Sequence, residues 1–568
     1  MKQRKQSSNL TYDKSGVSDW ISFHRLELFF LVLLLILGSI RGYWAPDEPD
    51  FAQCIKEMRQ GGDWLLPKLN GQIYTEKPIL FYWLMKCTAV GAEWVTGGLG
   101  FARGIAPWAL RLPSILAATA LVFGFRAWAR RFLDPGISES GTLIVLTTPI
   151  WIWQAQAIQI DMLFSALLAW SWMSWIAGYL IQSGLVLAKR DGESRRWFMI
   201  GYISLGLAVM AKGPLALVLS GAVVLSFLSW QKDWSSLRRT GLLSGILVLL
   251  GITLPWYLAA GIRGGPQYLY AMVVHQNVTR ALSAWDHIQP WWRYFGYLAV
   301  DFFPWSLLVP LALFAAIKNR AALKAVDRFS ILACVIPFIL LSLSRSKQGK
   351  YLLMIYPFLA MIVASQLQRV TSASIHNLRR FIGAALLLPG LAVLLIGLNR
   401  MGGAKLLTQV QPFLGPLRLL GLILVLGGVW VSNGVQWNDG RRLVLHTALP
   451  LILIFCLVLP WGMVRLDPLK DYKGWAGQTE PLLVNHRVFF WGDIRSGAMI
   501  YSDRLMPVLT TNAELDALGP GDRLIVTDRR WKPGIQGLDV ITMDKFRSVY
   551  RQQQGGDGMQ ILAPSLQP

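Results

Sequence analysis

Charged residues are scarce in this chain of 568 residues, since Asp, Glu, Lys and Arg together make up only 15% of it. Negative charge is the scarcer sign: 32 acidic residues face 55 Lys and Arg, a formal net charge of +23. The basic residues lie in short clusters between apolar runs, which is how membrane topology determinants are distributed. We therefore exclude nucleic acid as a partner.

Cysteine is also rare, with four residues and no CxxC pair, so the sequence contains no cysteine metal motif. Cys334 and Cys456 fall within apolar runs, and we expect Cys54 and Cys87 to be unpaired small hydrophobic residues as well. No internal repeat, low-complexity segment or nucleotide-phosphate loop is evident. The missing repeat argues against a transporter built from two related halves.

Long apolar runs dominate instead. The sequence is 54% hydrophobic, has 26 Trp and a mean hydropathy of +0.42. Runs of about 20 apolar residues can each cross a bilayer, which excludes an ordinary soluble domain. We predict a polytopic α-helical membrane protein with about thirteen spans, near residues 25–43, 108–129, 139–156, 159–181, 197–211, 213–230, 240–262, 294–316, 329–344, 350–367, 381–399, 414–433 and 443–463.

Basic clusters set the predicted orientation. If the N-terminus is cytoplasmic, every predicted cytoplasmic connection carries Lys or Arg, as at Arg130-Arg131, Arg238-Arg239 and Arg441-Arg442. The first apolar run lacks a small-residue cleavage site, so we expect a retained span rather than a signal peptide. An odd number of spans then places the C-terminal segment outside, which in a bacterium is the periplasm.

The predicted domains follow from a change in composition after residue 464. Residues 1–464 form the transmembrane domain, with outer loops at 44–107 and 263–293, in which 50–60 and 79–95 are expected to be amphipathic helices on the surface. Residues 465–568 read as a small soluble α/β domain. Its expected strands are 488–491, 499–502, 523–528 and 540–543, and a helix capped by Asn512 spans 512–518.

The first outer loop, Tyr43 to Lys86, concentrates polar side chains directly after an apolar run. It holds a carboxylate cluster followed by an LNG turn and an EKP triplet, contributing Asp47, Glu48, Asp50, Tyr74, Glu76 and Lys77. Ionisable groups beside a bilayer are costly, so such a cluster is a candidate functional site. The alternative is a solvated loop between two spans.

Further ionisable residues remain once the topology charges are set aside, and all fall at the outer ends of predicted spans. Asp161 opens the fourth span, and Lys212 lies in the AKGP turn. The others are His275 and Arg280 in the second outer loop and Lys350 and Tyr351 in SKQGKYLL. Each residue also has an alternative role outside a functional site, such as a lysine that snorkels to the membrane interface or an ordinary loop histidine. A single outward-facing site for an anionic lipid accounts for all of them.

These motifs resemble the bacterial lipid A 4-amino-4-deoxyarabinose transferase family, which is related to the protein O-mannosyltransferases. The family's first outer loop has an Asp-Glu pair, a GDW-x-x-P-x-LNG segment and a Y-x-EKPPL-x-YW segment, matched here by Asp47-Glu48, GDWLLPKLNG and YTEKPILFYW. The resemblance, more diffuse beyond this loop, covers about the first 360 residues. It implies the C-type glycosyltransferase fold and an inverting enzyme of the inner membrane that takes its sugar from a polyprenyl phosphate such as undecaprenyl phosphate.

Asp50 departs from the family pattern, which has Arg three positions after the Asp. A carboxylate there would repel a phosphate that the Arg would bind. Either the acceptor is a neutral hydroxyl, or Asp50 binds a cationic or hydroxyl-rich part of a different sugar. The third possibility is that Asp50 faces solvent in the first turn of a helix, where a carboxylate favours the dipole.

The resemblance also implies roles for the candidate residues. Asp47, Glu48 and Asp161 are the expected catalytic carboxylates: Asp47 acts as general base on a hydroxyl acceptor, or Asp47 and Asp161 orient the sugar when the acceptor is a phosphate of lipid A. The donor phosphate is expected to bind Tyr74, Lys77, Lys212, His275, Arg280, Lys350 and Tyr351. Glu76 and His275 are candidate ligands of a divalent metal, although two ligands are too few to establish a site.

Two functions from different classes remain. The first is transfer of 4-amino-4-deoxy-L-arabinose to lipid A, or of another lipid-linked sugar to a glycan or protein hydroxyl. The second is a lipid or sugar transporter. Transporters place ionisable residues near the bilayer midplane, whereas here they gather at one face, which favours the enzyme.

Overall fold

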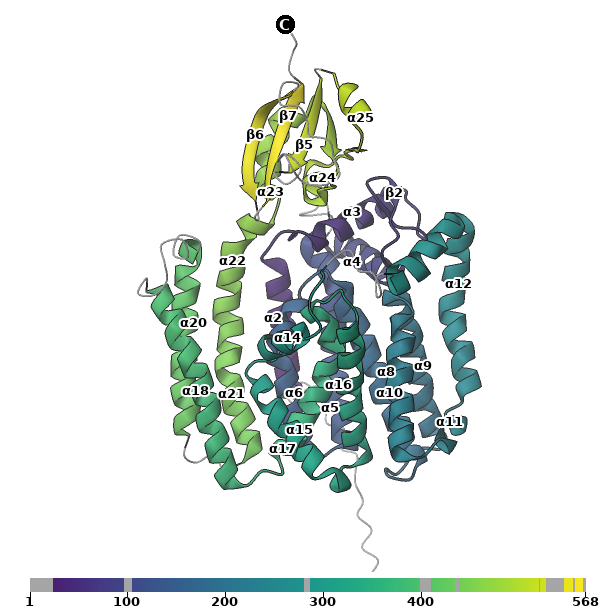
Figure 1. The fold of residues 1–568 in the computed structure, drawn as a ribbon, viewed down its shortest axis with the longest axis vertical. Helices are drawn as coiled ribbons and strands as arrows, with labels where there is room; N and C mark the ends of the chain where they lie inside the picture. The colour runs from purple at the N-terminus through teal and green to yellow at the C-terminus, as the bar shows by residue number, and fades with distance from the viewer. Residues whose placement is uncertain are drawn as a thin grey trace, which may run out of the picture.

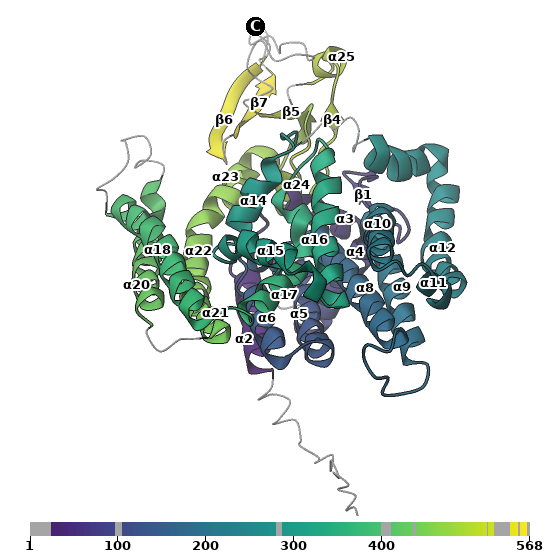
Figure 2. The same ribbon diagram turned by 60° about the horizontal axis from the view of Figure 1, so that its bottom comes forward.

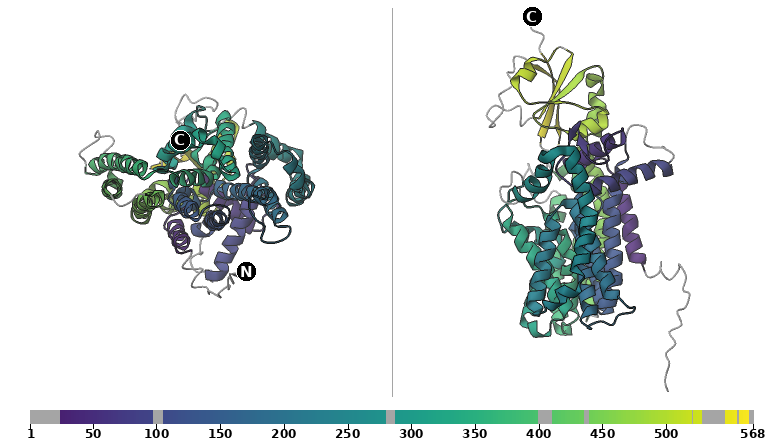
Figure 3. Two further views of the ribbon diagram at one scale, coloured as in Figure 1. Left: turned by 90° about the horizontal axis from the view of Figure 1, so that it is seen from below. Right: turned by 90° about the vertical axis from the view of Figure 1, so that its right-hand side faces the viewer.

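The computed structural model describes residues 24–96, 105–279, 287–398, 410–434, 439–519, 521–527, 546–554 and 557–564. A bundle of long helices carries a small α/β domain at one end (Figure 1). Figure 3 shows the same arrangement from the side and from below. Helix α2 (Arg25–Ser39) begins at the end of the bundle opposite this domain.

Eight helical segments in the described part of the chain are long and apolar enough to cross a membrane, and a bent pair raises the number to nine. In the bent pair, α14 (Arg293–Asp301) meets the segment Trp305–Lys318, made of η2 (Trp305–Leu308) and α15 (Val309–Lys318), at 117°. The eight segments are α5 (Pro107–Phe132), α8 (Ile160–Gln182), α12 (Leu242–Leu269) continued into η1 (Tyr270–Thr279), α16 (Ala325–Leu343), η4 (Gly349–Ile355) with α17 (Tyr356–Leu367), α18 (Ser372–Gly397), η5 (Gln411–Phe413) with α20 (Leu414–Asn433), and α21 (Gly440–Leu453) continued through η6 (Ile454–Val458) and α22 (Leu459–Lys470) into α23 (Lys473–Leu483).

Each of the thirteen predicted spans coincides with helix, but several of these helices are outside that set of eight. They are α2, α6 (Pro135–Leu146) with α7 (Pro149–Ala155), α9 (Glu193–Lys212) and α10 (Leu215–Gln231). Short connecting helices are α11 (Ser235–Arg239) and η3 (Arg320–Ala322). The α18–α20 pair lies at one side of the bundle and α12 at the other (Figure 2). The structure therefore shows a helical bundle with eight or nine candidate spans.

The first outer loop folds as two surface helices and a hairpin, close to the prediction. Helix α3 (Asp47–Arg59) buries Phe51, Cys54, Ile55 and Met58, and α4 (Leu80–Thr96) packs against it. Three carboxylates in the first turn of α3 suit the positive end of the helix dipole. The strands β1 (Lys68–Leu69) and β2 (Gln72–Ile73) pair antiparallel around Asn70 and Gly71, both with positive φ, which explains the LNG sequence.

The C-terminal domain has a five-stranded sheet in the order β4-β3-β5-β7-β6. Its strands are β3 (Arg487–Trp491), β4 (Val508–Leu509), β5 (Asp522–Thr527), β6 (Phe546–Gln554) and β7 (Asp557–Pro564), with β3 parallel to β4 and β5 and with β7 antiparallel to β5 and β6. Helix α24 (Ser496–Ser502) follows β3, and α25 (Asn512–Asp516) follows β4. Helix α22 runs past the predicted domain boundary at residue 464 and ends at Lys470.

Among the sequence predictions for this domain, two strands and one helix are confirmed, the helix as α25, while one strand and the cap of that helix are wrong. Strands at 488–491 and 523–528 are present as β3 and β5. The run 499–502, predicted as a strand, is instead part of helix α24, which buries Met499 and Ile500. The prediction failed because a short run of this kind does not distinguish a strand from a helix. The cap of α25 is Thr511 rather than Asn512: its hydroxyl accepts from the Glu514 amide in a capping box. The predicted strand 540–543 lies outside the described residues.

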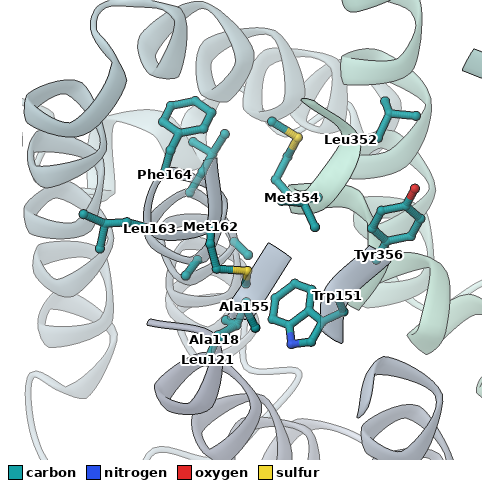
Figure 4. Close-up of a cluster of buried hydrophobic side chains, with 14 of the residues drawn as sticks. Ala118, Leu121, Trp151, Ala155, Met162, Leu163, Phe164, Leu352, Met354 and Tyr356 are labelled. Carbon is teal, nitrogen blue, oxygen red and sulfur yellow. The ribbon is translucent and has the colours of Figure 1, made fainter. Parts of the chain in front are cut away.

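The core of the bundle lies directly below the outer loop. Trp151 from α7, Met162 and Phe164 from α8 and Met354 from η4 meet in one cluster of buried side chains (Figure 4). All four are 2% exposed or less, so this part of the bundle is closely packed. The cluster fixes α8 against η4, and these two elements carry Asp161 and Lys350. The four cysteines are free, as predicted.

Candidate active site

Lys350 lies between two of the predicted carboxylates. Its Nζ donates to Asp47 Oδ2 at 3.1 Å and lies 3.9 Å from Asp161 Oδ2. The Asp161 side chain also forms an ion pair with Lys212 through Oδ1. Asp47 comes from the first turn of α3, Asp161 from the first turn of α8, and Lys212 from the last turn of α9. Four separate elements thus bring two acids and two lysines together.

The two carboxylates differ in exposure. The Asp161 side chain is 7% exposed, whereas that of Asp47 is 41% exposed. Asp47 Oδ2 also accepts from Gln159 Nε2 at 3.1 Å, a neutral neighbour that sequence reasoning had no signal to find. Asp161 is therefore a buried anchor for the lysines, and Asp47 is the carboxylate with an open face.

Two more predicted residues join this cluster. The Lys212 ammonium lies 4.2 Å from the centre of the Tyr351 ring, within cation–π range. Lys77 interacts electrostatically with Asp161. Lys77, Lys212 and Lys350 therefore all act on Asp161, and Tyr351 lies against Lys212. We call these residues, with Asp47 and Asp161, the lysine cluster.

The AKGP turn places Lys212 by its backbone geometry. Gly213 ends α9 with a φ of +97°, a conformation that favours glycine. A β-carbon on Gly213 would lie 3.1 Å from Asn277 Oδ1, so η1 packs against the turn. His275 is an exposed residue of the same helix. The η1 part of the second predicted outer loop therefore lies beside the turn that carries Lys212, as a single site requires. Arg280 is outside the described residues.

Glu48 makes a different set of contacts from its neighbour Asp47. Its Oε2 accepts from Arg41 Nη1 at 2.8 Å and from Arg111 Nη2 at 2.7 Å, and its Oε1 accepts from the Ile158 amide at 2.9 Å. Burial opposes ionisation, but the two guanidinium groups hold the pKa of Glu48 at about 2. Arg111 itself is completely buried and also donates to the carbonyl of Gly38. This buried ion-pair group fixes the start of α3.

Arg41 and Arg111 were missed by the sequence analysis. Each lies within a predicted span, and the sequence alone does not reveal that its ion-pair partner is Glu48. Both oxygens of Glu48 are occupied by these arginines and by backbone amides. Glu48 therefore lies near the lysine cluster in sequence but has no oxygen turned toward it.

A second group of acidic side chains surrounds Asp50. Burial, together with the charges of Asp47 and Glu76, raises the pKa of Asp50 to about 7, although Ser496 and Arg495 act in the opposite direction. Asp50 is partly buried and does not face open solvent. Burial and the Glu76 carboxylate likewise raise the pKa of the Tyr74 hydroxyl. Tyr74 thus lies with Glu76 and Asp50 rather than with the lysine cluster to which the sequence assigned it.

The candidate metal ligands are not supported by a third residue. Glu76 and His275 are both exposed. In the part of the chain that the structure describes, no group of three or more His, Cys, Asp and Glu side chains is arranged to hold a metal ion. The geometry of this loop therefore gives no complete ligand set.

The C-terminal domain packs on α3 next to these residues. Lys56 Nζ lies 2.6 Å from Asp503 Oδ1. The side-chain Nδ2 of Asn70 donates to the backbone carbonyl of Met506 at 2.7 Å, and the backbone amide of Met506 donates to Asn70 Oδ1 at 3.1 Å. Helix α24 contacts α3 directly. The domain therefore holds the element that carries Asp47 and Asp50.

Exchanging the charges of this ion pair tests whether the domain positions α3. We expect Lys56→Asp to lower several-fold the turnover number of the sugar transfer that the sequence predicts. The substitution places an aspartate next to Asp503, and the repulsion loosens the contact between α3 and the C-terminal domain. Asp503→Lys alone should act in the same direction, and the double variant Lys56→Asp/Asp503→Lys should recover most of the activity. Steady-state kinetics of the four proteins give the coupling directly. Additive losses in the double variant would contradict a positioning role.

No family model matches the chain. It is 32% identical over 448 residues to the undecaprenyl phosphate-alpha-4-amino-4-deoxy-L-arabinose arabinosyl transferase of Pseudomonas paraeruginosa, covering 77% of this chain and 74% of that protein. It is 28% identical over 459 residues to the protein of the same name from Edwardsiella ictaluri, covering 76% and 77%.

Among solved structures, the chain resembles the crystal structure of ArnT from Cupriavidus metallidurans bound to undecaprenyl phosphate. The TM-score is 0.75 at 18% identity, and the match covers 96% of this chain and 98% of the other. The apo state of the same protein matches with a TM-score of 0.75 at 17% identity. At these identities the likeness establishes a shared fold.

Proposed function

The chain belongs to the family of undecaprenyl phosphate-alpha-4-amino-4-deoxy-L-arabinose arabinosyl transferases, and from this membership we propose that it transfers 4-amino-4-deoxy-L-arabinose from undecaprenyl phosphate to lipid A. The protein is a multi-pass membrane glycosyltransferase. The observation that carries the proposal is the lysine cluster, in which Lys350 lies between Asp47 and Asp161. It combines a group of phosphate-binding cations with an exposed carboxylate at the end of the bundle next to the C-terminal domain.

The cations act on the leaving group. In the reaction an acceptor oxygen attacks the anomeric carbon, the bond from that carbon to the donor phosphate oxygen breaks, and undecaprenyl phosphate leaves with the electron pair. The phosphate gains negative charge as this bond breaks. Lys77, Lys212 and Lys350, with the Tyr351 hydroxyl, therefore stabilise the transition state more than the bound donor. His275 and Arg280 complete the proposed phosphate site from the second outer loop.

Asp47 and Asp161 act on the sugar side of the same reaction. A phosphate acceptor such as that of lipid A is already anionic, so Asp47 orients the sugar and Lys350 instead of removing a proton. With a hydroxyl acceptor, Asp47 is the general base. Asp161 keeps Lys212 and Lys350 in place, and we assign Glu48 to positioning α3 through Arg41 and Arg111.

The proposed site uses no metal-dependent step. Glu76 and His275 supply two ligands, and a catalytic zinc site needs three from the protein. Dialysis against a chelator, followed by the transfer assay with and without added Zn²⁺ or Mg²⁺, tests this assignment. We expect unchanged activity. A loss that one metal restores, and that His275→Ala mimics, would establish a metal site there.

We propose that all thirteen helical segments cross the membrane, with residue 24 on the cytoplasmic side and the C-terminal domain in the periplasm. The basic clusters support this orientation, as does the position of α2 opposite the C-terminal domain. In a cysteine-free background, a membrane-impermeant thiol reagent should label single cysteines on the outer side and spare those on the inner side. The outer positions are Gln60, Gln267 and Leu505, and the inner positions are Asp191, Lys232 and Arg441. Protection of position 505 in intact cells would overturn the odd number of spans.

Mass spectrometry of lipid A and other envelope glycans, with and without the protein, tests the function. We expect a mass increase of one aminoarabinose on lipid A only when the active protein is present. A sugar added to another glycan or to protein would keep the enzyme class and change the acceptor, the outcome that Asp50 would favour. Proton-coupled uptake in proteoliposomes without any transfer would instead support a transporter.

A further inference from the structure

Asp50 belongs to a group of acidic side chains to which the proposed reaction gives no role. It follows Asp47 by three residues, so both side chains lie on the same face of α3. The charges of Asp47 and Glu76 both act on Asp50, and the Glu76 carboxylate lies beside the Tyr74 hydroxyl. The acids Asp50 and Glu76 and the phenol of Tyr74 therefore form one group next to Asp47.

A buried hydroxyl provides a second and independent sign of a ligand. Tyr82 is completely buried, and no side chain or backbone group in the described ranges hydrogen bonds to its hydroxyl. The same hydroxyl interacts electrostatically with Tyr74, Glu76 and Asp50, and the Tyr74 and Tyr82 rings meet edge to face at 6.5 Å. Buried hydroxyls are nearly always hydrogen-bonded, so the Tyr82 hydroxyl is an unsatisfied polar group beside these acids, and a bound molecule would supply its missing partner.

The charges around these residues favour a cation. Asp47 is engaged by Lys350. Among the charges that act on Asp50, those of Asp47 and Glu76 are negative, and that of Arg495 at the start of α24 is positive. The other nearby charges are already paired, as in Lys56 with Asp503. An excess of one negative charge in a partly buried space attracts a protonated amine and repels a phosphate.

We propose that Asp50, Glu76, Tyr74 and Tyr82 form a subsite for the protonated amine of the donor sugar, with Asp50 as the residue that discriminates amino sugars from neutral ones. The assignment rests on the proposed function, since that function supplies an amine-bearing sugar. It explains how a carboxylate is accommodated where the resembling family has arginine: Asp50 contacts the sugar while the lysines hold the phosphate. The C-terminal domain closes the subsite through α24.

Two donors separate this role from a structural one: undecaprenyl phosphate carrying 4-amino-4-deoxy-L-arabinose, and the same donor with the amine acetylated. We expect the full-length wild-type protein in detergent to bind and use the amino donor at least about tenfold better, the loss expected when a hydrogen bond to a charged group is removed. Asp50→Asn should raise KM for the amino donor by about tenfold and leave kcat and the acetylated donor nearly unchanged. Asp50→Glu should restore the preference, and Asp50→Arg should abolish it.

Controls make the outcome decisive. Asp191→Asn removes the same charge from an exposed position outside the site and should leave both donors unaffected, and Tyr82→Phe should raise KM for both by a smaller factor. Thermal unfolding confirms that each variant is folded. An unchanged donor preference in Asp50→Asn, or an equal loss of kcat with both donors, overturns the subsite. Calorimetric Kd values for the two donors test it even if the wild-type protein transfers neither sugar, a result that would instead overturn the proposed function.

Discussion

Replacing Asp47 with asparagine is expected to lower kcat by about 100-fold or more, the scale of a positioned acid or base, while the protein stays folded. Asp47 is 41% exposed and is not part of a packed core. Its carboxylate holds Lys350 at 3.1 Å, and a neutral amide neither balances that charge nor accepts a proton. Transfer measured by mass spectrometry, with thermal unfolding of the same samples, separates the loss of turnover from a loss of structure.

The neighbouring residues give a matched series for this experiment. Asp161→Asn should be as severe in kcat but should also lower stability, because Asp161 is buried and its loss leaves the Lys212 charge without its anion. Asp134→Asn changes an exposed carboxylate outside the cluster and should leave transfer intact. Wild-type turnover in Asp47→Asn would remove Asp47 from the mechanism.

Arg111→Ala should produce the second large effect, a loss of about 3–5 kcal/mol in the free energy of unfolding. The substitution leaves the Glu48 carboxylate buried with one arginine instead of two, and it removes the donors to the carbonyls of Gly38, Arg41 and Gly42. Such a change is a large fraction of the stability of a typical domain. We expect a sharp drop in folded yield and in the unfolding temperature, measured by size exclusion with fluorescence detection.

A second arginine nearby provides the control. Arg59, at the end of α3, pairs with Glu93 where both side chains are partly exposed, so Arg59→Ala should cost no more than about 1 kcal/mol. Glu48→Gln keeps the shape of the buried group and tests the charge alone; it should also be strongly destabilising. Equal unfolding temperatures for Arg111→Ala and Arg59→Ala would show that the buried group does not hold the loop.

The sequence was most informative where ionisable residues are costly. Lys212, Lys350 and Asp161 stood out because they remained after the topology charges were removed, and the structure brings all three together. The neutral neighbour Gln159 gave no such signal. Arg495 could not be foreseen at the site, because a soluble domain contains many arginines and only the docking of α24 on α3 brings this one near Asp50.

The limits of prediction for the fold have a similar origin. Apolar runs located helices at all thirteen predicted positions, since a bilayer span is long and its signal is strong. They could not indicate that α14 meets the following segment at 117°, because tertiary packing determines such a bend. In the C-terminal domain the run 499–502, Met-Ile-Tyr-Ser, was too short to distinguish the helix α24 from a strand.

The pairing of Lys212 and Lys350 with Asp161 and Asp47 also bears on how the spent lipid leaves. Two positive and two negative side chains cancel, so the lysines that hold the departing phosphate have counterions beside them. In the proposed mechanism, when undecaprenyl phosphate dissociates, Asp161 and Asp47 balance the charges of Lys212 and Lys350, which would otherwise be left without a counterion. We expect this pairing to ease the release of the lipid product.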